Sequence, residues 1–183
     1  GDPDWGVDSS QVQDRLKGVQ QVQASCSAFA AILSDGSVVT WGDPHCGGDS
    51  SEVQDRLKGV QQVQGTLGAF AAILADGSVV TWSDPDYGGD SSEVQDRLKS
   101  VQQIQANSYA FAAILADGSV VTWGSPHFGG DSSEVQDQLK IVQQVQGTLG
   151  AFAAILADGS VVTWGEPDFG GDSSEVQDQL KIV

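Results

Sequence analysis

Several residue types are scarce or absent in this chain of 183 residues. It has no methionine, two cysteines, two histidines, and eight lysine or arginine residues against 25 acidic ones, for a formal net charge of −17. This charge argues against nucleic acid or an anionic membrane as a partner, because both bind clustered Lys and Arg. No apolar run approaches the roughly 20 residues of a membrane span, so we expect a soluble chain without membrane insertion. The missing methionine favours a piece of a longer product.

The chain is rich in internal repetition. Residues 65–82 recur letter for letter at 147–164, and four tryptophans stand 41 residues apart at the ends of similar apolar units. We expect these tryptophans in the core, between neighbouring sheets: Trp41, Trp82, Trp123 and Trp164. We predict one repeat domain over 1–183. Its parts are an N-terminal connector (1–18), blades at about 19–41, 60–82, 101–123 and 142–164, connectors at 42–59, 83–100 and 124–141, and a C-terminal connector (165–183).

The apolar unit predicts three antiparallel strands. In the first copy, 19–23 alternates imperfectly, 29–33 is apolar and 37–41 is β-branched. Asp35-Gly36 predicts a two-residue hairpin turn with positive φ at both positions. If the first strand is fully extended, its two valines point to opposite faces. The middle strand should be buried on both faces. The alternative is a buried helix at AFAAIL, since Ala and Leu favour helix.

The acidic unit predicts a short helical connector. Pro44 and the following Gly-Gly pair break regular structure, and Asp49-Ser-Ser-Glu52 is typical of an N-cap with its capping-box partner. Val53 and Leu57 then share one helical face. We predict a helix of about two turns that joins one sheet to the next.

A period of about 41 residues with small all-β meanders predicts β-propeller-like blades. The string AFAAILADGSVVTWG, followed by a Gly-Gly loop, resembles the regulator of chromosome condensation repeat family. The 41-residue, three-stranded form is similar to the propeller-type β-lactamase inhibitor protein. The sequence of the repeat is similar to tandem repeats of dinoflagellate algal proteins. The resemblance implies the fold. It implies no single function, since such families include an exchange factor, ubiquitin-ligase segments, a photoreceptor and inhibitors.

Four blades predict an open arc or part of a larger propeller. A self-closed ring of four blades is the alternative. Two chains could close a ring of eight, but each junction would then hold two connectors, 1–18 and 165–183, where one is expected. That redundancy disfavours simple closure.

The meander places the loop at about 25–27 and the exit of the third strand (42–48) at the same sheet end. Bulky and imidazole side chains recur there, and we predict a protein-binding rim. Its residues are Trp5, His45, Cys46, Leu67, Tyr87, Tyr109, His127, Phe128, Leu149 and Phe169. The alternative is that each ring packs over its own Gly-Gly loop and proline.

Cys26 and Cys46 fall on this same rim. They could form a disulfide, which would imply an oxidising compartment such as an organelle lumen. The alternative is two isolated thiols that replace Leu67 and Tyr87 of the next repeat. The compartment is otherwise unspecified by the sequence.

The loop at 84–93 is rich in oxygen ligands, but a calcium loop needs a bidentate Glu where this chain has Gln95. Helix capping explains Asp90 and Glu93 more simply. We therefore predict no metal and no cofactor, with weak calcium binding as the alternative.

These observations favour a non-enzymatic repeat scaffold for protein–protein interaction. The partner is a protein of unknown identity, and the chain could be a homo-oligomer or a peripheral subunit of a larger assembly. One alternative is an enzyme inhibitor that acts through the same rim. A second is an enzyme with a site at the axis of the array, although the apolar units offer only Gln, Ser and Thr there. We predict no catalytic residue.

Overall fold

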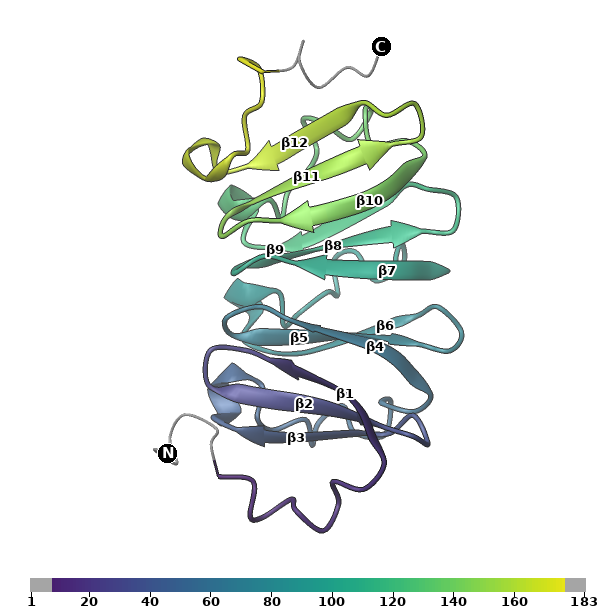
Figure 1. Ribbon diagram of the computed structural model, residues 1–183, viewed down its shortest axis with the longest axis vertical. Helices are drawn as coiled ribbons and strands as arrows, with labels where there is room; N and C mark the ends of the chain where they lie inside the picture. The colour runs from purple at the N-terminus through teal and green to yellow at the C-terminus, as the bar shows by residue number, and fades with distance from the viewer. Residues whose placement is uncertain (1–7, 177–183) are drawn as a thin grey trace.

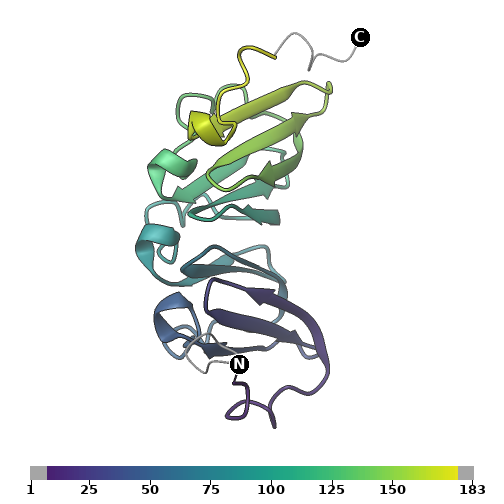
Figure 2. The same cartoon turned by 60° about the vertical axis from the view of Figure 1, so that its left-hand side comes forward.

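The computed structural model describes residues 8–176, whose strands form four three-stranded antiparallel sheets that we call blades 1 to 4. The strands are β1 (Val19–Ala24), β2 (Ala28–Leu33) and β3 (Val38–Gly42); β4 (Val60–Gly65), β5 (Ala69–Leu74) and β6 (Val79–Ser83); β7 (Val101–Ala106), β8 (Ala110–Leu115) and β9 (Val120–Gly124); and β10 (Val142–Gly147), β11 (Ala151–Leu156) and β12 (Val161–Gly165). The predicted meander is confirmed. Figures 1 and 2 show an open stack with blades 1 and 4 at opposite ends, so the self-closed ring is wrong.

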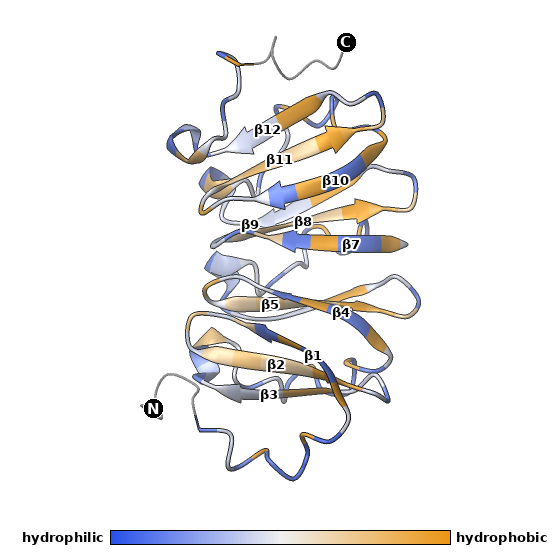
Figure 3. Cartoon of the chain, viewed as in Figure 1, coloured by the Kyte–Doolittle hydropathy of each residue, from blue (hydrophilic) through white to orange (hydrophobic). Residues whose placement is uncertain are grey.

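Each pair of neighbouring blades encloses one hydrophobic cluster. In blade 2, Phe70 and Ala72 of β5 face blade 1, whereas Ala71 and Ile73 face blade 3. Figure 3 shows the hydrophobic colour along the middle strands. The middle strands of the two inner blades, β5 and β8, are buried on both sides, as expected. The middle strands of the end blades, β2 and β11, are fully buried on one side only. The alternative of a helix at AFAAIL is wrong.

Every blade therefore has two different faces. We call the side that packs on the preceding blade the aromatic face; in blade 2 it comprises Val60, Val63, Phe70, Ala72, Val80 and Trp82. We call the side that packs on the following blade the alanine face; in blade 1 it comprises Ala28, Ala30, Ile32 and Val38. The small alanines let the sheets approach closely, and the aromatic rings of the next blade fill the space between them.

A bulge in each first strand places two β-branched residues on the same face, Val and Ile in blade 3 and two valines in the other blades. In blade 2, Val60 pairs with Leu74 and Gln62 pairs with Ile73, so the first strand has one residue more than its partner. Val60 and Val63 are consequently both buried in one cluster. The expectation that these valines point to opposite faces is wrong, because it assumed an unbroken strand.

The hairpin turn has three residues, not two. Gly36 N–H donates to the Leu33 carbonyl, and Leu33 N–H donates to the Ser37 carbonyl, each at 2.9 Å. Only Gly36 has positive φ (76°), as in a type I turn followed by a left-handed glycine. The predicted two-residue turn with positive φ at both positions is wrong. Hydrogen bonds from the Ser37 side chain and backbone hold the Asp35 carboxylate and lower its pKa.

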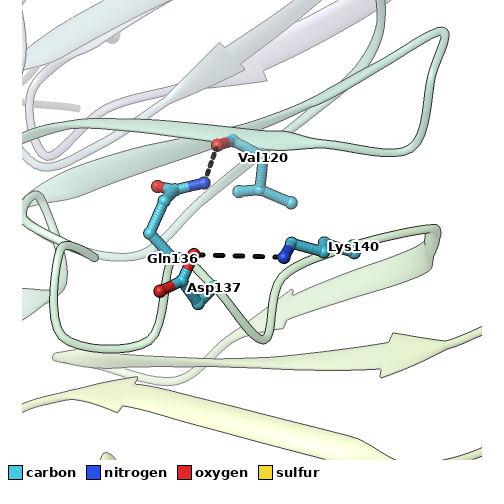
Figure 4. A network of polar contacts seen from close by, with 4 residues as sticks. All are labelled: Val120, Gln136, Asp137 and Lys140. Atoms are coloured by element: carbon cyan, nitrogen blue, oxygen red, sulfur yellow. Dashed lines mark hydrogen bonds and ion pairs between the residues drawn. The ribbon is translucent and has the colours of Figure 1, made fainter.

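The connectors contain a short 3-10 helix and hydrogen-bonded turns, and the predicted helix of two turns is wrong. The 3-10 helices are η2 (Pro44–Cys46), η3 (Pro85–Tyr87), η4 (Pro126–Phe128) and η5 (Pro167–Phe169). The Asp49 carboxylate accepts a hydrogen bond from Ser51 N–H at 2.9 Å, two residues on, and so forms a local turn in place of the predicted capping box with Glu52. Segments this short nucleate helix poorly, and side-chain bonds to the sheet fix the chain instead. Figure 4 shows one: Gln136 Nε2 donates to the Val120 carbonyl at 3.1 Å, beside an exposed Lys140–Asp137 pair.

In blades 2 to 4, a tryptophan links the blade to the connector before it. The indole N–H groups donate to the carbonyls of Gly47, Gly88 and Gly129 at 3.0–3.1 Å, from Trp82, Trp123 and Trp164 respectively. All three tryptophans are buried. Trp41, expected in the core with them, is only half-buried, because no blade of the described chain covers the aromatic face of blade 1.

Replacing Phe111 by alanine should destabilise the fold strongly. Phe111 is fully buried and stacks on Trp123 with ring centroids 5.2 Å apart, and a buried Phe→Ala change costs about 3–5 kcal/mol. Phe29→Ala is the matched control, since Phe29 occupies the same position on a half-exposed face. Urea denaturation should show the larger loss for Phe111→Ala; equal losses would contradict this packing.

Replacing Ile141 by glycine should stabilise the fold by about 1 kcal/mol, because a β-branched residue is strained at positive φ. Ile141 has φ 56°, is exposed, and stands where Gly59 (φ 66°) stands in an earlier repeat. The opposite change, Gly59→Ile, should destabilise the fold. A lower thermal midpoint for Ile141→Gly would contradict the prediction.

Candidate protein interaction site

Two loops of each blade meet at the sheet end opposite the hairpin turn. A side chain of the first loop donates to the carbonyl that ends the 3-10 helix. These bonds run from Ser25 to Cys46 (2.7 Å), Thr66 to Tyr87 (2.9 Å), Asn107 to Phe128 (2.6 Å) and Thr148 to Phe169 (2.8 Å). We call these paired loops the rim; its residues are 25–27 with 42–48, 66–68 with 83–89, 107–109 with 124–130, and 148–150 with 165–171.

A row of aromatic rings runs along the rim across blades 2 to 4. Tyr109 stacks between Tyr87 and Phe128, with ring centroids 5.5 Å and 4.3 Å away. Phe169 continues the row, tilted, at 6.4 Å from Phe128. The first three rings are half-buried and Phe169 is exposed. The row thus presents ring edges and faces to solvent while its members support one another.

Tyr109 is the residue that makes the row continuous. The other repeats have Ser27, Gly68 and Gly150 at this position. A Cβ at Gly68 would lie 2.7 Å from the Tyr87 ring, so that ring packs over the loop of its own blade. At Tyr109 the loop instead contributes a ring of its own. The sequence analysis placed Tyr109 near the rim but did not predict the stack. The feature that could have indicated it is a tyrosine at a position where the other repeats have a small residue.

The other expected rim residues lie on the same end of the sheets. His45 and His127 are exposed on the 3-10 helices, and Leu67 and Leu149 are exposed on the first loops. Trp5 lies outside the described residues.

The first loops also form a backbone ladder from blade to blade that the sequence did not predict. Cys26 N–H donates to the Leu67 carbonyl (3.1 Å), Leu67 N–H to the Ser108 carbonyl (2.9 Å), and Ser108 N–H to the Leu149 carbonyl (3.2 Å). These bonds hold the loops of successive blades in register. A backbone ladder leaves no residue pattern, because any residue except proline can donate.

Lys and Arg are absent from the rim, whereas carboxylates lie at both ends of the sheets, since the hairpin turns carry Asp35, Asp76, Asp117 and Asp158. The rim carries Asp43, Asp84, Asp86, Glu166 and Asp168, and within its described residues it has no Lys or Arg. In the first connector, Lys58 comes shortly before Val60, whose N–H donates to the Gly36 carbonyl of the hairpin turn at 2.8 Å, so this basic side chain lies toward the other end. The rim is therefore an acidic surface interrupted by aromatic rings and two imidazoles.

The two cysteines lie together on the rim of blade 1. Their Sγ atoms are 3.0 Å apart as free thiols; Cys26 is exposed and Cys46 half-buried. Burial, and then the hydrogen bond with Cys26, raise the pKa of Cys46 to about 12.

The acidic loops use their carboxylates internally. Asp90 accepts from Ser92 N–H at 2.8 Å, and the Ser92 backbone and side chain lower its pKa. Among residues 8–176, no three His, Cys, Asp or Glu side chains gather as a metal site would require. In that same part of the chain, no helix has the length and apolarity to cross a membrane.

No family model matches the sequence, and no curated protein matches it. Solved structures do match the fold. Yeast RCC1 (Prp20) bound to Kap60 is 16% identical, with a TM-score of 0.63 over 85% of this chain and 45% of that one. Prp20p from Saccharomyces cerevisiae, described with its binding to Gsp1p and histones, is 14% identical with a TM-score of 0.56, over 80% and 45%. The CRINKLY WD40 ectodomain of the Arabidopsis thaliana receptor kinase ACR4 is 21% identical with a TM-score of 0.54, over 84% and 52%. The chain thus spans about half the length of these proteins, and at such identities the likeness establishes an RCC1-like repeat fold alone.

Proposed function

We propose that this protein is a non-enzymatic repeat scaffold whose rim binds another protein. One observation carries the proposal: the aromatic row of Tyr87, Tyr109, Phe128 and Phe169 is partly exposed on a surface without Lys or Arg. Aromatic side chains with an apolar body and a polar surround are typical of binding hot spots. The stacked rings lose little conformational entropy when a partner covers them.

The chemistry of the rim specifies the kind of partner. Acidic side chains beside aromatic faces attract Lys and Arg, through ion pairs and through cation–π contact with the rings. The protein's net charge of −17 would steer a basic partner toward it. A partner with a basic segment is thus favoured, and its binding should weaken as salt screens the charges.

The proteins with similar folds support an interaction role in general terms. Yeast RCC1 is bound to Kap60 in one structure, and Prp20p is described with Gsp1p and histones. These partners belong to those proteins. They support the view that this architecture carries protein interactions, and they name no partner for this chain.

Tyr109→Gly should reduce partner binding at least tenfold without unfolding the protein, because it removes the ring at the centre of the row. Glycine already occupies the equivalent positions in blades 2 and 4, so the loop accepts it. The variant and the wild-type chain would serve as bait in the native extract, and the amount of any stoichiometric partner would be compared.

Ile141→Ala is the matched control, since it removes an exposed apolar side chain away from the rim. Circular dichroism melts should show both variants folded. Equal partner recovery with Tyr109→Gly and Ile141→Ala would contradict the proposal, as would recovery that rises with salt.

We also propose that Cys26 and Cys46 form a disulfide under oxidising conditions. The thiols are already in contact, so little backbone movement is needed. The bond would close a short loop that includes the whole of β2 and β3, and a loop of this size stabilises a fold by about 3 kcal/mol. It would tie the two loops of the rim in the one blade that lacks an aromatic ring there.

Oxidation of the native chain should lower its mass by two hydrogen atoms and raise its thermal midpoint. The control is Cys26→Leu with Cys46→Tyr, which takes the residues of blade 2 and so fits the fold. This variant should show neither change. Thiols that stay fully open to alkylation after oxidation would refute the disulfide.

A further inference from the structure

The aromatic face of blade 1 is exposed where every other copy of that face is buried. Val22 is 47% exposed, and its counterpart in blade 2, Val63, is 0% exposed. Val19 is likewise exposed, and Phe29 is half-buried on the same face. This end of the array is half of a blade–blade interface without its other half.

The alanine face of blade 4 is exposed in the same way at the opposite end. Ile155 is 39% exposed, whereas its counterpart Ile73 is 4% exposed. Ala153 and Val161 on that face are half-buried. Inside the array, Ile32 is the equivalent of Ile155, and Val63 is the equivalent of Val22. Ile32 and Val63 pack in one hydrophobic cluster.

The two open faces are therefore complementary in detail. The interior junctions unite an alanine face with an aromatic face three times within this chain. The strands that form these faces repeat nearly letter for letter. The shape that fits at the interior junctions is thus available again between the two ends.

The backbone ladder of the rim is complementary at its ends as well. At each step the N–H of one loop donates to the carbonyl of the next blade's loop. Among the described residues, Leu149 N–H has no acceptor and the Cys26 carbonyl has no donor. One end offers the donor and the other the acceptor that one further step requires. This observation is independent of the apolar faces.

We propose that a second copy of this chain docks head to tail, with the alanine face of blade 4 of one copy on the aromatic face of blade 1 of the other. Leu149 N–H of the first copy then donates to the Cys26 carbonyl of the second. The contact is heterologous, so each copy keeps one open face of each kind unless the assembly closes on itself.

The connectors decide how such a junction is filled. An interior junction holds one connector, whose Leu57 enters the cluster. Residues 165–176 keep the interior path, since Thr163 donates to Ser173 at 2.9 Å as Thr40 contacts Ser50 at 3.0 Å in blade 1. Residues 8–18 form the same turns as an interior connector, since Ser10 N–H donates to Asp8 at 2.9 Å as Ser51 N–H donates to Asp49 at 2.9 Å. The proposed contact therefore requires one of these two connectors to leave the place that a single connector occupies inside the array.

Sedimentation velocity on the 183-residue chain tests this proposal. The wild type should shift with concentration from 19.0 kDa to twice that mass or more. High salt should promote this shift, because the copies repel each other at low ionic strength. Ile155→Glu and Val22→Glu should each remove it, while Ile141→Glu, an exposed site away from both end faces, should not. Melts by circular dichroism would establish that all three variants fold.

Mixing the two end-face variants gives the decisive result. Ile155→Glu retains an intact aromatic face and Val22→Glu an intact alanine face, so the mixture should form a one-to-one dimer and nothing larger. Deleting residues 1–18 should leave association intact. A wild type that stays at 19.0 kDa at every concentration, a mixture that stays monomeric, or loss of association on that deletion would each overturn the proposal.

Discussion

Packing of an aromatic face on an alanine face is the contact on which the rest of this structure depends. A three-stranded sheet needs a packed hydrophobic face to be stable, and here neighbouring blades and connector leucines cover those faces. The alanines set a close spacing, and the Phe and Trp rings fill it. That spacing in turn brings successive rim loops within hydrogen-bond distance and lets Tyr109 stack between two rings.

Much of the fold could be predicted from the sequence because the repeat shows one pattern several times over. The apolar run at 69–74 and the β-branched run at 79–82 recur with one spacing, which is strong support for strands. The bulge in β4 could not be predicted in this way. Val60 and Val63 are three residues apart, which puts them on opposite faces of a regular strand and on one face only if the strand has a bulge. The prediction of the turn at Asp35-Gly36 was wrong for another reason. Glycine at positive φ occurs in both two-residue and three-residue hairpins, and only the hydrogen bonds distinguish them.

The sequence predicted at which end of the sheets the aromatic residues of the rim lie, but it did not predict how their rings stack. The equivalence of Tyr87, Phe128 and Phe169 among repeats placed them at one sheet end. The stack depends on side-chain directions, which no spacing encodes. The prediction of a helix in the connector was wrong because Asp49 and Ser51 form a local turn as readily as they cap a helix. In addition, the Gln54 side chain donates to the Val38 carbonyl of the sheet. Tertiary contacts, not local propensity, decide the path of this segment.

The bulge in each first strand has a consequence for how such an array can change length. Because it gives every blade the same two faces in the same order, a duplication or loss of one 41-residue unit would replace one junction with another of the same kind. No core would need to be redesigned, and no loop would need to be refitted. The number of blades is then a quantity that recombination can alter at little structural cost, and the aromatic row on the rim would grow or shorten in step with it.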